Sequence, residues 1–227
     1  LNAFKDMGVK IEREGSNVVI NGVGMNGLRP SLKPLNLGNS GTSIRLMTGL
    51  LSAQNFDSIL CGDESLSKRP MARIIDPLRE MGAIIKSSDS MPPLSISGNQ
   101  KLSALKYTLP VASAQIKSCL LLAGLYADGE TCITENETTR DHTERMLKGF
   151  GYQVTSFSGK VSLTGGGQLQ ACDIEVPSDI SSAAFFIVAA SIAKNADITL
   201  EAVNINPTRT GVIEILKLMG ANIELNN

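Results

Sequence analysis

A glycine-rich run at residues 37–45, Leu-Gly-Asn-Ser-Gly-Thr-Ser-Ile-Arg, lies where an apolar helix is expected to begin. Polar side chains such as Asn39 and Thr42 cap helix starts, and the free backbone N–H groups and the helix dipole together favour phosphate or carboxylate. Because Gly41 has no Cβ, a ligand can approach the main chain closely there. Arg45, one turn into the helix, supplies a positive charge or supports the loop. The run therefore predicts an anion-binding site, and an ordinary capped helix is the alternative.

Two later helix starts have the same character. In residues 109–117, Ser113 can cap the helix and donate its hydroxyl to an oxyanion. In the same run, Gln115 offers a donor and an acceptor to a polyhydroxylated ligand. In residues 176–182, Asp179 lies among the capping residues of the corresponding helix. Any one such cap is more often structural than functional.

Arginines recur at the starts of a second set of helices, at Arg69, Arg140 and Arg209. A cation opposes the dipole at a helix N-terminus, so this placement is unfavourable for the helix and suggests a functional reason. A guanidinium can bind a phosphate through two hydrogen bonds. The alternative is a solvated side chain or a local ion pair. We interpret Arg69 and Arg140 as functional, and Arg209 as a solvated side chain or a member of a local ion pair.

Other catalytic chemistry has no recognisable motif. The sequence has no Ser-His-Asp arrangement and no Gly-x-Gly-x-x-Gly loop after a predicted strand. Its four cysteines form no Cys-x-x-Cys pair, and the single histidine, His142, has no ligand partner at metal-binding spacing, so we expect buried free thiols, no metal and no cofactor. Asp141 and Glu144 resemble a D-x-x-E helix cap. No residue is a convincing general acid, so the sequence identifies no catalytic residue.

The helix starts belong to a repeat. Four helical endings share a terminal glycine, and these glycines are 74, 69 and 69 residues apart. They are Gly8, Gly82, Gly151 and Gly220. Each predicts a helix C-terminus followed by a short alternating strand. Together with the preceding segments, the repeat is strand, helix, strand, helix, strand, strand, which indicates an α/β fold of repeated βαβαββ units.

The first helix of each unit is expected at residues 42–51, 114–125 and 181–193, and each is almost wholly apolar. Such helices are expected to be buried on all sides, with sheets outside them. The chain begins and ends inside a unit, so we expect structure to be missing at both ends. The expected strands are residues 9–12, 17–21, 57–61, 83–86, 93–97, 105–109, 130–134, 152–154, 160–164, 174–176, 197–201 and 221–225.

Bulk composition restricts the class of partner. The 227 residues are 42% hydrophobic and 19% charged, with a net charge of −1, so nothing suggests a nucleic acid or a membrane surface as partner. No apolar run is long enough to cross a bilayer, and no signal-peptide pattern opens the chain. We expect a cytoplasmic protein that binds small anions through local clusters of basic groups.

Several runs carry a resemblance to a known family. Residues 37–45 and 62–71, the latter Gly-Asp-Glu-Ser-Leu-Ser-Lys-Arg-Pro-Met, resemble the 5-enolpyruvylshikimate-3-phosphate synthases, also called 3-phosphoshikimate 1-carboxyvinyltransferases. Residues 112–118, 139–144 and 206–211 resemble the form in the glyphosate-tolerant bacterial branch. The similarity follows the whole chain in order.

The resemblance implies a two-domain inverted α/β barrel of the enolpyruvyl transferase type, incomplete here. Residues 1–167 would be part of the first domain (the back half of one unit and two full units), and residues 168–227 the first unit of the second. The implied reaction transfers the enolpyruvyl group of phosphoenolpyruvate to the 5-hydroxyl of shikimate 3-phosphate and releases phosphate, a late step towards chorismate and the aromatic amino acids. The complete enzyme would be a monomer, and the chain alone is expected to be inactive.

The resemblance also implies roles for individual residues. Those expected to contact phosphoenolpyruvate are Gly41, Arg69 and Gln115. Those expected to bind shikimate 3-phosphate are Ser113, Ala114, Gln115 and Arg140, with Arg140 on the phosphate. Ala114 stands where other members have a second serine, so one phosphate contact is lost and Arg140 compensates. Candidates for supporting roles are Asn39, Thr42, Arg45 and Asp179.

Two alternatives stay open at this point. A related transferase acting on UDP-N-acetylglucosamine is expected to have a reactive cysteine on a loop between Gly62 and Arg79, and none occurs there. A non-catalytic anion-binding scaffold of stacked units is the other alternative.

Overall fold

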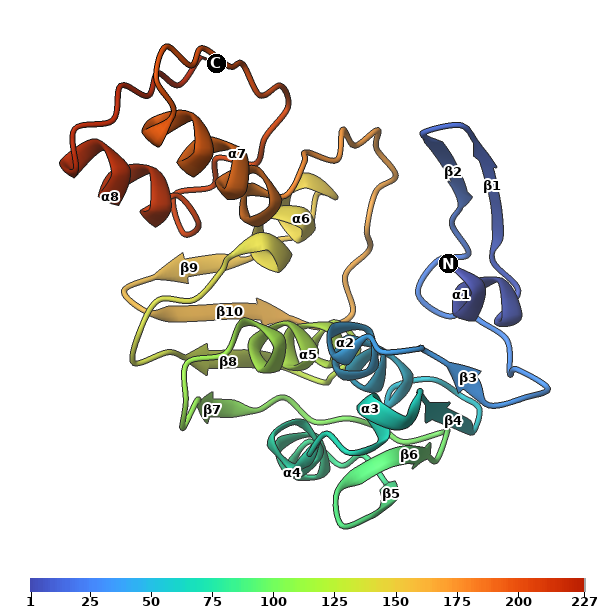
Figure 1. Cartoon of the computed structure of the whole chain (residues 1–227). Helices are drawn as coiled ribbons and strands as arrows, with labels where there is room; N and C mark the ends of the chain where they lie inside the picture. The colour runs from blue at the N-terminus through green and yellow to red at the C-terminus, as the bar shows by residue number, and fades with distance from the viewer. Residues whose placement is uncertain (227) are drawn as a thin grey trace. The chain divides into compact units, whose positions relative to one another are not determined.

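The computed structural model describes residues 1–226, and it divides into two compact units, Leu1–Cys172 and Asp173–Asn227 (Figure 1). Each unit is described separately below. The first contains two four-stranded sheets, a hairpin and most of the helices, and the second contains two helices.

The first sheet has the strand order β3-β4-β6-β5. Its strands are β3 (Leu35–Asn36), β4 (Ser58–Cys61), β5 (Ile85–Ser88) and β6 (Met91–Ile96). β3 and β4 are parallel and are connected through helix α2 (Gly41–Leu51), whereas the other pairs are antiparallel. Pro92, Leu94 and Ile96 of β6 are buried, and they alternate with more exposed residues as in a half-buried strand.

The second sheet repeats this arrangement in the order β7-β8-β10-β9. Its strands are β7 (Lys106–Thr108), β8 (Glu130–Thr134), β9 (Thr155–Phe157) and β10 (Lys160–Thr164). β7 and β8 are parallel and are connected through helix α5 (Ala114–Gly124), and the other pairs are antiparallel. The repeated βαβαββ unit is thereby confirmed for the first unit of the structure.

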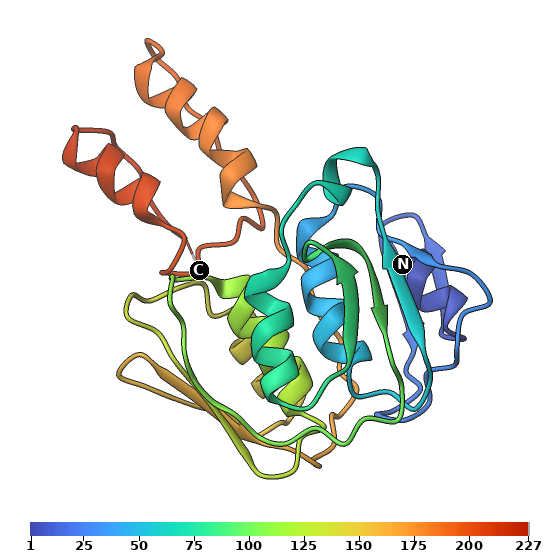
Figure 2. The same ribbon diagram turned by 90° about the horizontal axis from the view of Figure 1, so that it is seen from below.

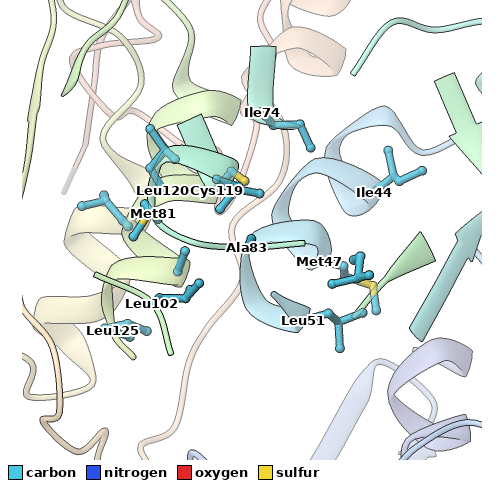
Figure 3. Close-up of a cluster of buried hydrophobic side chains, with 14 of the residues drawn as sticks. Ile44, Met47, Leu51, Ile74, Met81, Ala83, Leu102, Cys119, Leu120 and Leu125 are labelled. Carbon is cyan, nitrogen blue, oxygen red and sulfur yellow. The ribbon is translucent and has the colours of Figure 1, made fainter. Parts of the chain in front are cut away.

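Helices α2 and α5 pack directly against each other, between the two sheets in Figure 2. The contact is close because α2 contains Gly49, where a Cβ would lie 2.2 Å from the carbonyl oxygen of Cys119. The prediction that these helices are buried is confirmed along most of their length, since Ile44, Leu51 and Leu120 are fully buried, but the start of α2 is open at the exposed Thr42. Side chains of this core are drawn in Figure 3; those labelled are Ile44, Met47, Leu51, Ile74, Met81, Ala83, Leu102, Cys119, Leu120 and Leu125.

The second helix of each repeat lies outside this pair. α4 (Ala72–Glu80) contacts both α2 and α5, and it is preceded by the short helix α3 (Glu64–Ser67). α6 (His142–Gly149) follows β8 in the second repeat. At the N-terminus, α1 (Asn2–Asp6) leads into an antiparallel hairpin of β1 (Lys10–Glu14) and β2 (Asn17–Asn21).

One strand in the first unit was placed wrongly. The segment 152–154 is not a strand; the chain enters the sheet only at β9, Thr155–Phe157. The Tyr152 ring is buried instead, and its hydroxyl donates to the carbonyl oxygen of Thr164 at 2.7 Å. The alternating pattern predicted an extended strand here. In the structure, the buried Tyr152 instead fixes the connection between α6 and β9.

The second unit differs more from expectation. Its helices are α7 (Ile180–Ile192) and α8 (Gly211–Leu218), but the predicted strands at 174–176, 197–201 and 221–225 are not formed. One parallel bridge between Ser178 and Val203 is the only strand pairing among the described residues of this unit. A strand needs a neighbour to satisfy its backbone groups, and fifty-odd residues with two helices supply none.

The prediction that α7 is buried on all sides is also wrong for this structure. Only Ile180 and Ala183 of this helix are buried, against Ile213 of α8, whereas Phe185 is 80% exposed. Most of the apolar surface of α7 is therefore not covered by other residues of this unit.

Candidate functional site

The glycine-rich loop ends in the N-terminus of α2. The amide of Gly38, at a positive φ of 58°, donates to Oδ1 of Asn36 at 2.9 Å, which turns the chain after β3. Ser40 is the N-cap, and its hydroxyl accepts from the amide of Ser43 at 3.1 Å. Gly41 and Thr42 begin the helix, so the first-turn amides point towards the loop.

Three predicted residues meet at this point. Nη1 of Arg45 donates to Oε1 of Gln115 at 2.8 Å and to the carbonyl oxygen of Gly41 at 3.2 Å. Nε2 of Gln115 donates to the hydroxyl of Thr42 at 2.8 Å. The amide of Gln115 thus has a fixed orientation between two groups of α2, although it comes from α5.

A second guanidinium reaches the same place. Nη2 of Arg69, from the turn between α3 and α4, donates to Oδ1 of Asn39 at 2.6 Å. A Cβ at Gly41 would lie 2.9 Å from Nη1 of Arg45 and 3.0 Å from Nη1 of Arg69. Gly41 therefore marks the point where two guanidinium groups converge on a helix N-terminus, an arrangement that suits a bound anion.

The electrostatics agree with this. The pKa of Arg45 is lowered mainly by burial and further by the positive charges of Arg69 and Arg73. Three guanidinium groups close enough to repel one another are stabilised by an anion between them. The sequence interpretation overlooked Arg73, although it follows Arg69 by four residues and lies on the first turn of α4.

Ser113 is the N-cap of α5, as predicted, and Ala114 is the first residue of the helix. The capping bond is long: the Ser113 hydroxyl accepts from the amide of Ile116 at 3.4 Å. A hydroxyl held this weakly keeps the capacity to donate to a ligand oxyanion.

Arg140 lies just before α6, and its side chain is exposed. No hydrogen bond joins it to Ser113 or Gln115 within residues 1–226. The reading of Asp141 and Glu144 as a helix cap is wrong. Asp141 occupies the N-cap position without a capping side-chain bond and accepts from Nε of Arg145 at 2.7 Å, while Glu144 turns inward to Lys117.

Asp179 and Arg209 both belong to the second unit. Oδ1 of Asp179 caps α7 by accepting from the amide of Ser181 at 3.0 Å. The guanidinium of Arg209 lies 3.3 Å from the same oxygen and also donates to the hydroxyl of Ser181. Of the two alternatives expected for Arg209, a solvated side chain or a local ion pair, the structure shows the ion pair.

The four cysteines are free. Cys119 is fully buried, and burial raises the pKa of its thiol to about 12. The expectation of buried thiols is wrong for Cys172, which is exposed. Among the described residues, His, Cys, Asp and Glu side chains form no group of three or more that could hold a metal ion. Every helix described is too short or too polar to span a lipid bilayer.

Comparison with known proteins places this geometry in a family. The family model described as EPSP synthase (3-phosphoshikimate 1-carboxyvinyltransferase) matches residues 1–227. The chain belongs to the EPSP synthase family. Its fold is the α/β fold of the enolpyruvyl transferases, present here in part.

Similar proteins are close in sequence and structure. The 3-phosphoshikimate 1-carboxyvinyltransferases of Vesicomyosocius okutanii subsp. Calyptogena okutanii and Ruthia magnifica subsp. Calyptogena magnifica are 67% and 68% identical over 227 residues, which are 100% of this chain and 52% of each relative. The structure of EPSP synthase from Acinetobacter baumannii superposes with a TM-score of 0.94 at 60% identity, again over 100% of this chain and 52% of that one. The chain thus spans about half the length of the relatives it matches.

Proposed function

We propose that the full-length protein containing these residues transfers the enolpyruvyl group of phosphoenolpyruvate to the 5-hydroxyl of shikimate 3-phosphate and releases phosphate. The observation that carries the proposal is the placement of Gln115 between Arg45 and Thr42, beside Arg69. A neutral amide of fixed orientation next to converging guanidinium groups suits a ligand with both hydroxyl and anionic groups. The family match and the names of the similar enzymes support the same reaction.

Within this proposal the two substrates use different helix starts. Phosphoenolpyruvate binds at the N-terminus of α2, where Gly41 leaves space and Arg69 neutralises negative charge. Gln115 contacts both substrates. Shikimate 3-phosphate binds at the N-terminus of α5, near Ser113 and Ala114, with Arg140 on its phosphate.

The reaction needs more than these residues provide. Both substrates are polyanions, so basic groups and helix termini lower the cost of bringing them together. Protonation of the methylene carbon generates the cationic centre that the hydroxyl attacks, and this requires an acid. The arginines bind and orient the substrates, and they are poor proton donors because a guanidinium holds its proton too tightly. We therefore place the proton transfer on residues outside this chain, and we expect the 227-residue chain alone to be inactive.

The proposal extends to organisation. Residues 1–167 are assigned to the first domain and residues 168–227 to the second, and the complete protein is proposed to act as a cytoplasmic monomer without a cofactor.

The test is an assay of phosphate release by the full-length protein. We expect release only when phosphoenolpyruvate and shikimate 3-phosphate are both present, and the R69M variant should raise the KM for phosphoenolpyruvate about tenfold or more, because a charge-assisted hydrogen bond contributes about 1.5–3 kcal/mol. K68M, which removes a neighbouring exposed cation, is the matched control and should behave as wild type. Release with UDP-N-acetylglucosamine as acceptor would favour the related transferase. Binding of both anions without any turnover would favour a scaffold.

A further inference from the structure

A buried charge cluster lies beside the proposed shikimate 3-phosphate site. Lys117 of α5 is 1% exposed, and its Nζ lies 2.8 Å from Oε2 of Glu135 and 2.7 Å from Oε1 of Glu144. Both carboxylate side chains are only 4% exposed. None of these three residues has a role in the function proposed above.

The cluster joins the two ends of one loop. Glu135 follows directly after β8, and Glu144 lies on the first turn of α6. Lys117 therefore binds both ends of residues 135–144, the segment that carries Arg140. Figure 1 shows α5, β8 and α6 following one another in this part of the chain.

Two further contacts tighten the same loop. The hydroxyl of Thr139, next to Arg140, donates to Oε1 of Glu135. The hydroxyls of Ser118 on α5 and Thr143 on α6 lie 2.6 Å apart. The backbone of Arg140 is thus flanked by side chains that are tied to the cluster or to α5.

Lys117 is also tied to the other half of the site. Its backbone amide donates to the carbonyl oxygen of Ser113 at 3.1 Å, one helical turn away. A single turn of α5 therefore carries the hydroxyl proposed to bind shikimate 3-phosphate and the ammonium that holds the Arg140 loop. The spacing between the two halves of the site is set through Lys117.

Burial of these charges is a poor way to stabilise a fold. Removing two carboxylates and one ammonium from water is costly, and well-packed apolar side chains of similar size often serve stability equally well or better. Oε2 of Glu144 is buried without a hydrogen-bond partner among the described residues, which adds to the cost. What the ions provide and apolar groups would not is a directional link between helix and loop.

We propose that Lys117 is a positioning residue, which holds Arg140 at the phosphate of shikimate 3-phosphate by binding Glu135 and Glu144. The inference rests on the proposed function, since it requires Arg140 to bind that phosphate. Lys117 itself does not touch the ligand. Its removal releases the loop at both ends and leaves the phosphoenolpyruvate side, at α2 and Arg69, unchanged.

The experiment measures KM for each substrate, and the Kd of shikimate 3-phosphate by calorimetry, in the full-length protein. K117M keeps an unbranched side chain, shorter by the terminal atom, and removes its charge. We expect the KM and Kd for shikimate 3-phosphate to rise about tenfold, and the KM for phosphoenolpyruvate to stay within about twofold of wild type. K68M, which breaks the exposed Lys68–Glu64 pair, is the control and should change neither.

A double-mutant cycle with R140M separates positioning from general loss of structure. If Lys117 acts through Arg140, K117M has no further effect on shikimate 3-phosphate binding once Arg140 is replaced. Equal effects of K117M in the wild-type and R140M backgrounds would overturn the inference. If R140M alone leaves the Kd unchanged, the assignment of Arg140 in the proposed function fails, which is a separate and recognisable result.

Two more variants test the inference in case K117M does not fold. K117M/E135Q/E144Q removes all three charges, so it leaves no uncompensated ion and should fold while still binding shikimate 3-phosphate about tenfold more weakly. E144Q keeps the Lys117–Glu135 pair and should give a smaller rise in the same direction. Wild-type affinity in both variants would contradict a positioning role.

Discussion

Arg45 of α2 donates from Nη1 to Oε1 of Gln115 of α5 at 2.8 Å, and together with the Gln115–Thr42 hydrogen bond this contact joins the first helices of two successive repeats at their N-termini. Below this contact the same helices pack through apolar side chains and the close approach at Gly49. The core thus fixes the separation of the helices, and the Arg45–Gln115 bond fixes how their first turns face a ligand. Repetition of one unit therefore places the two helix starts proposed to bind anions next to each other.

Replacing Gln115 by glutamate tests the orientation of this amide. Q115E removes the donor to Thr42 and adds a negative charge where two polyanionic substrates are proposed to meet. We expect kcat/KM in the full-length protein to fall about thirtyfold or more, since a lost hydrogen bond to a charged group costs about 2 kcal/mol. The melting temperature should change little because the new carboxylate can pair with Arg45. Unchanged kcat/KM would place the substrates elsewhere.

Alanine substitutions at two glycines of α2 should affect different properties, the KM for phosphoenolpyruvate at Gly41 and the stability of the fold at Gly49. In G41A the new Cβ meets only the tips of Arg45 and Arg69, at 2.9 and 3.0 Å, which can move. Thermal stability should fall by less than about 1 kcal/mol, while the KM for phosphoenolpyruvate rises because both guanidinium groups are displaced. In G49A the Cβ would lie 2.2 Å from the Cys119 carbonyl oxygen, so the helix pair must separate and the variant should lose about 3 kcal/mol or more. Measurements of KM and melting temperature on both variants check the contrast.

The sequence was most informative where a repeat and a chemical rule agreed. Glycine spacing and apolar periodicity predicted α2, α5 and the strands at 17–21, 130–134 and 160–164 with little or no error in their bounds. Family resemblance pointed to Gln115, which meets Arg45 and Thr42 in the structure.

Features that depend on long-range contacts were not predictable in the same way. Nothing in the apolar sequence around Lys117 indicated that its side chain would pair with Glu135 and Glu144. Both glutamates lie at least 18 positions further along the chain. The D-x-x-E pattern predicted a cap, but the buried ammonium attracts Glu144 away from the helix end. The strands predicted in the second unit have the right alternation and no partner, since a strand forms only where another strand accepts its hydrogen bonds.

Alanine at Ser113 should affect binding more than folding. The capping bond of 3.4 Å from Ile116 is weak, so S113A should cost about 0.5 kcal/mol of stability, at the low end for a lost N-cap. The Kd of shikimate 3-phosphate should rise about tenfold because the hydroxyl is the proposed donor to the ligand. S191A, which removes an exposed hydroxyl bonded to the Ile187 carbonyl oxygen within α7, is the control and should leave the Kd unchanged. A fall in melting temperature with an unaltered Kd would show that Ser113 serves only as a cap.

Cys119 should make stability depend on pH in the alkaline range. Burial raises the pKa of its thiol from 9.0 to about 12 in the folded protein, so between these values the unfolded chain loses a proton that the folded chain keeps. The stability from the neutral buried thiol is therefore complete below pH 9 and declines as pH rises towards 12, by about 1 kcal/mol per pH unit. C119A has no thiol to ionise at this position. The melting temperature of wild type should therefore exceed that of C119A by a smaller amount at about pH 10.5 than at about pH 8.5. C172A removes an exposed thiol, and its difference from wild type should stay constant over the same range. A constant difference for C119A as well would mean that the buried thiol ionises as readily in the folded protein as in the unfolded chain.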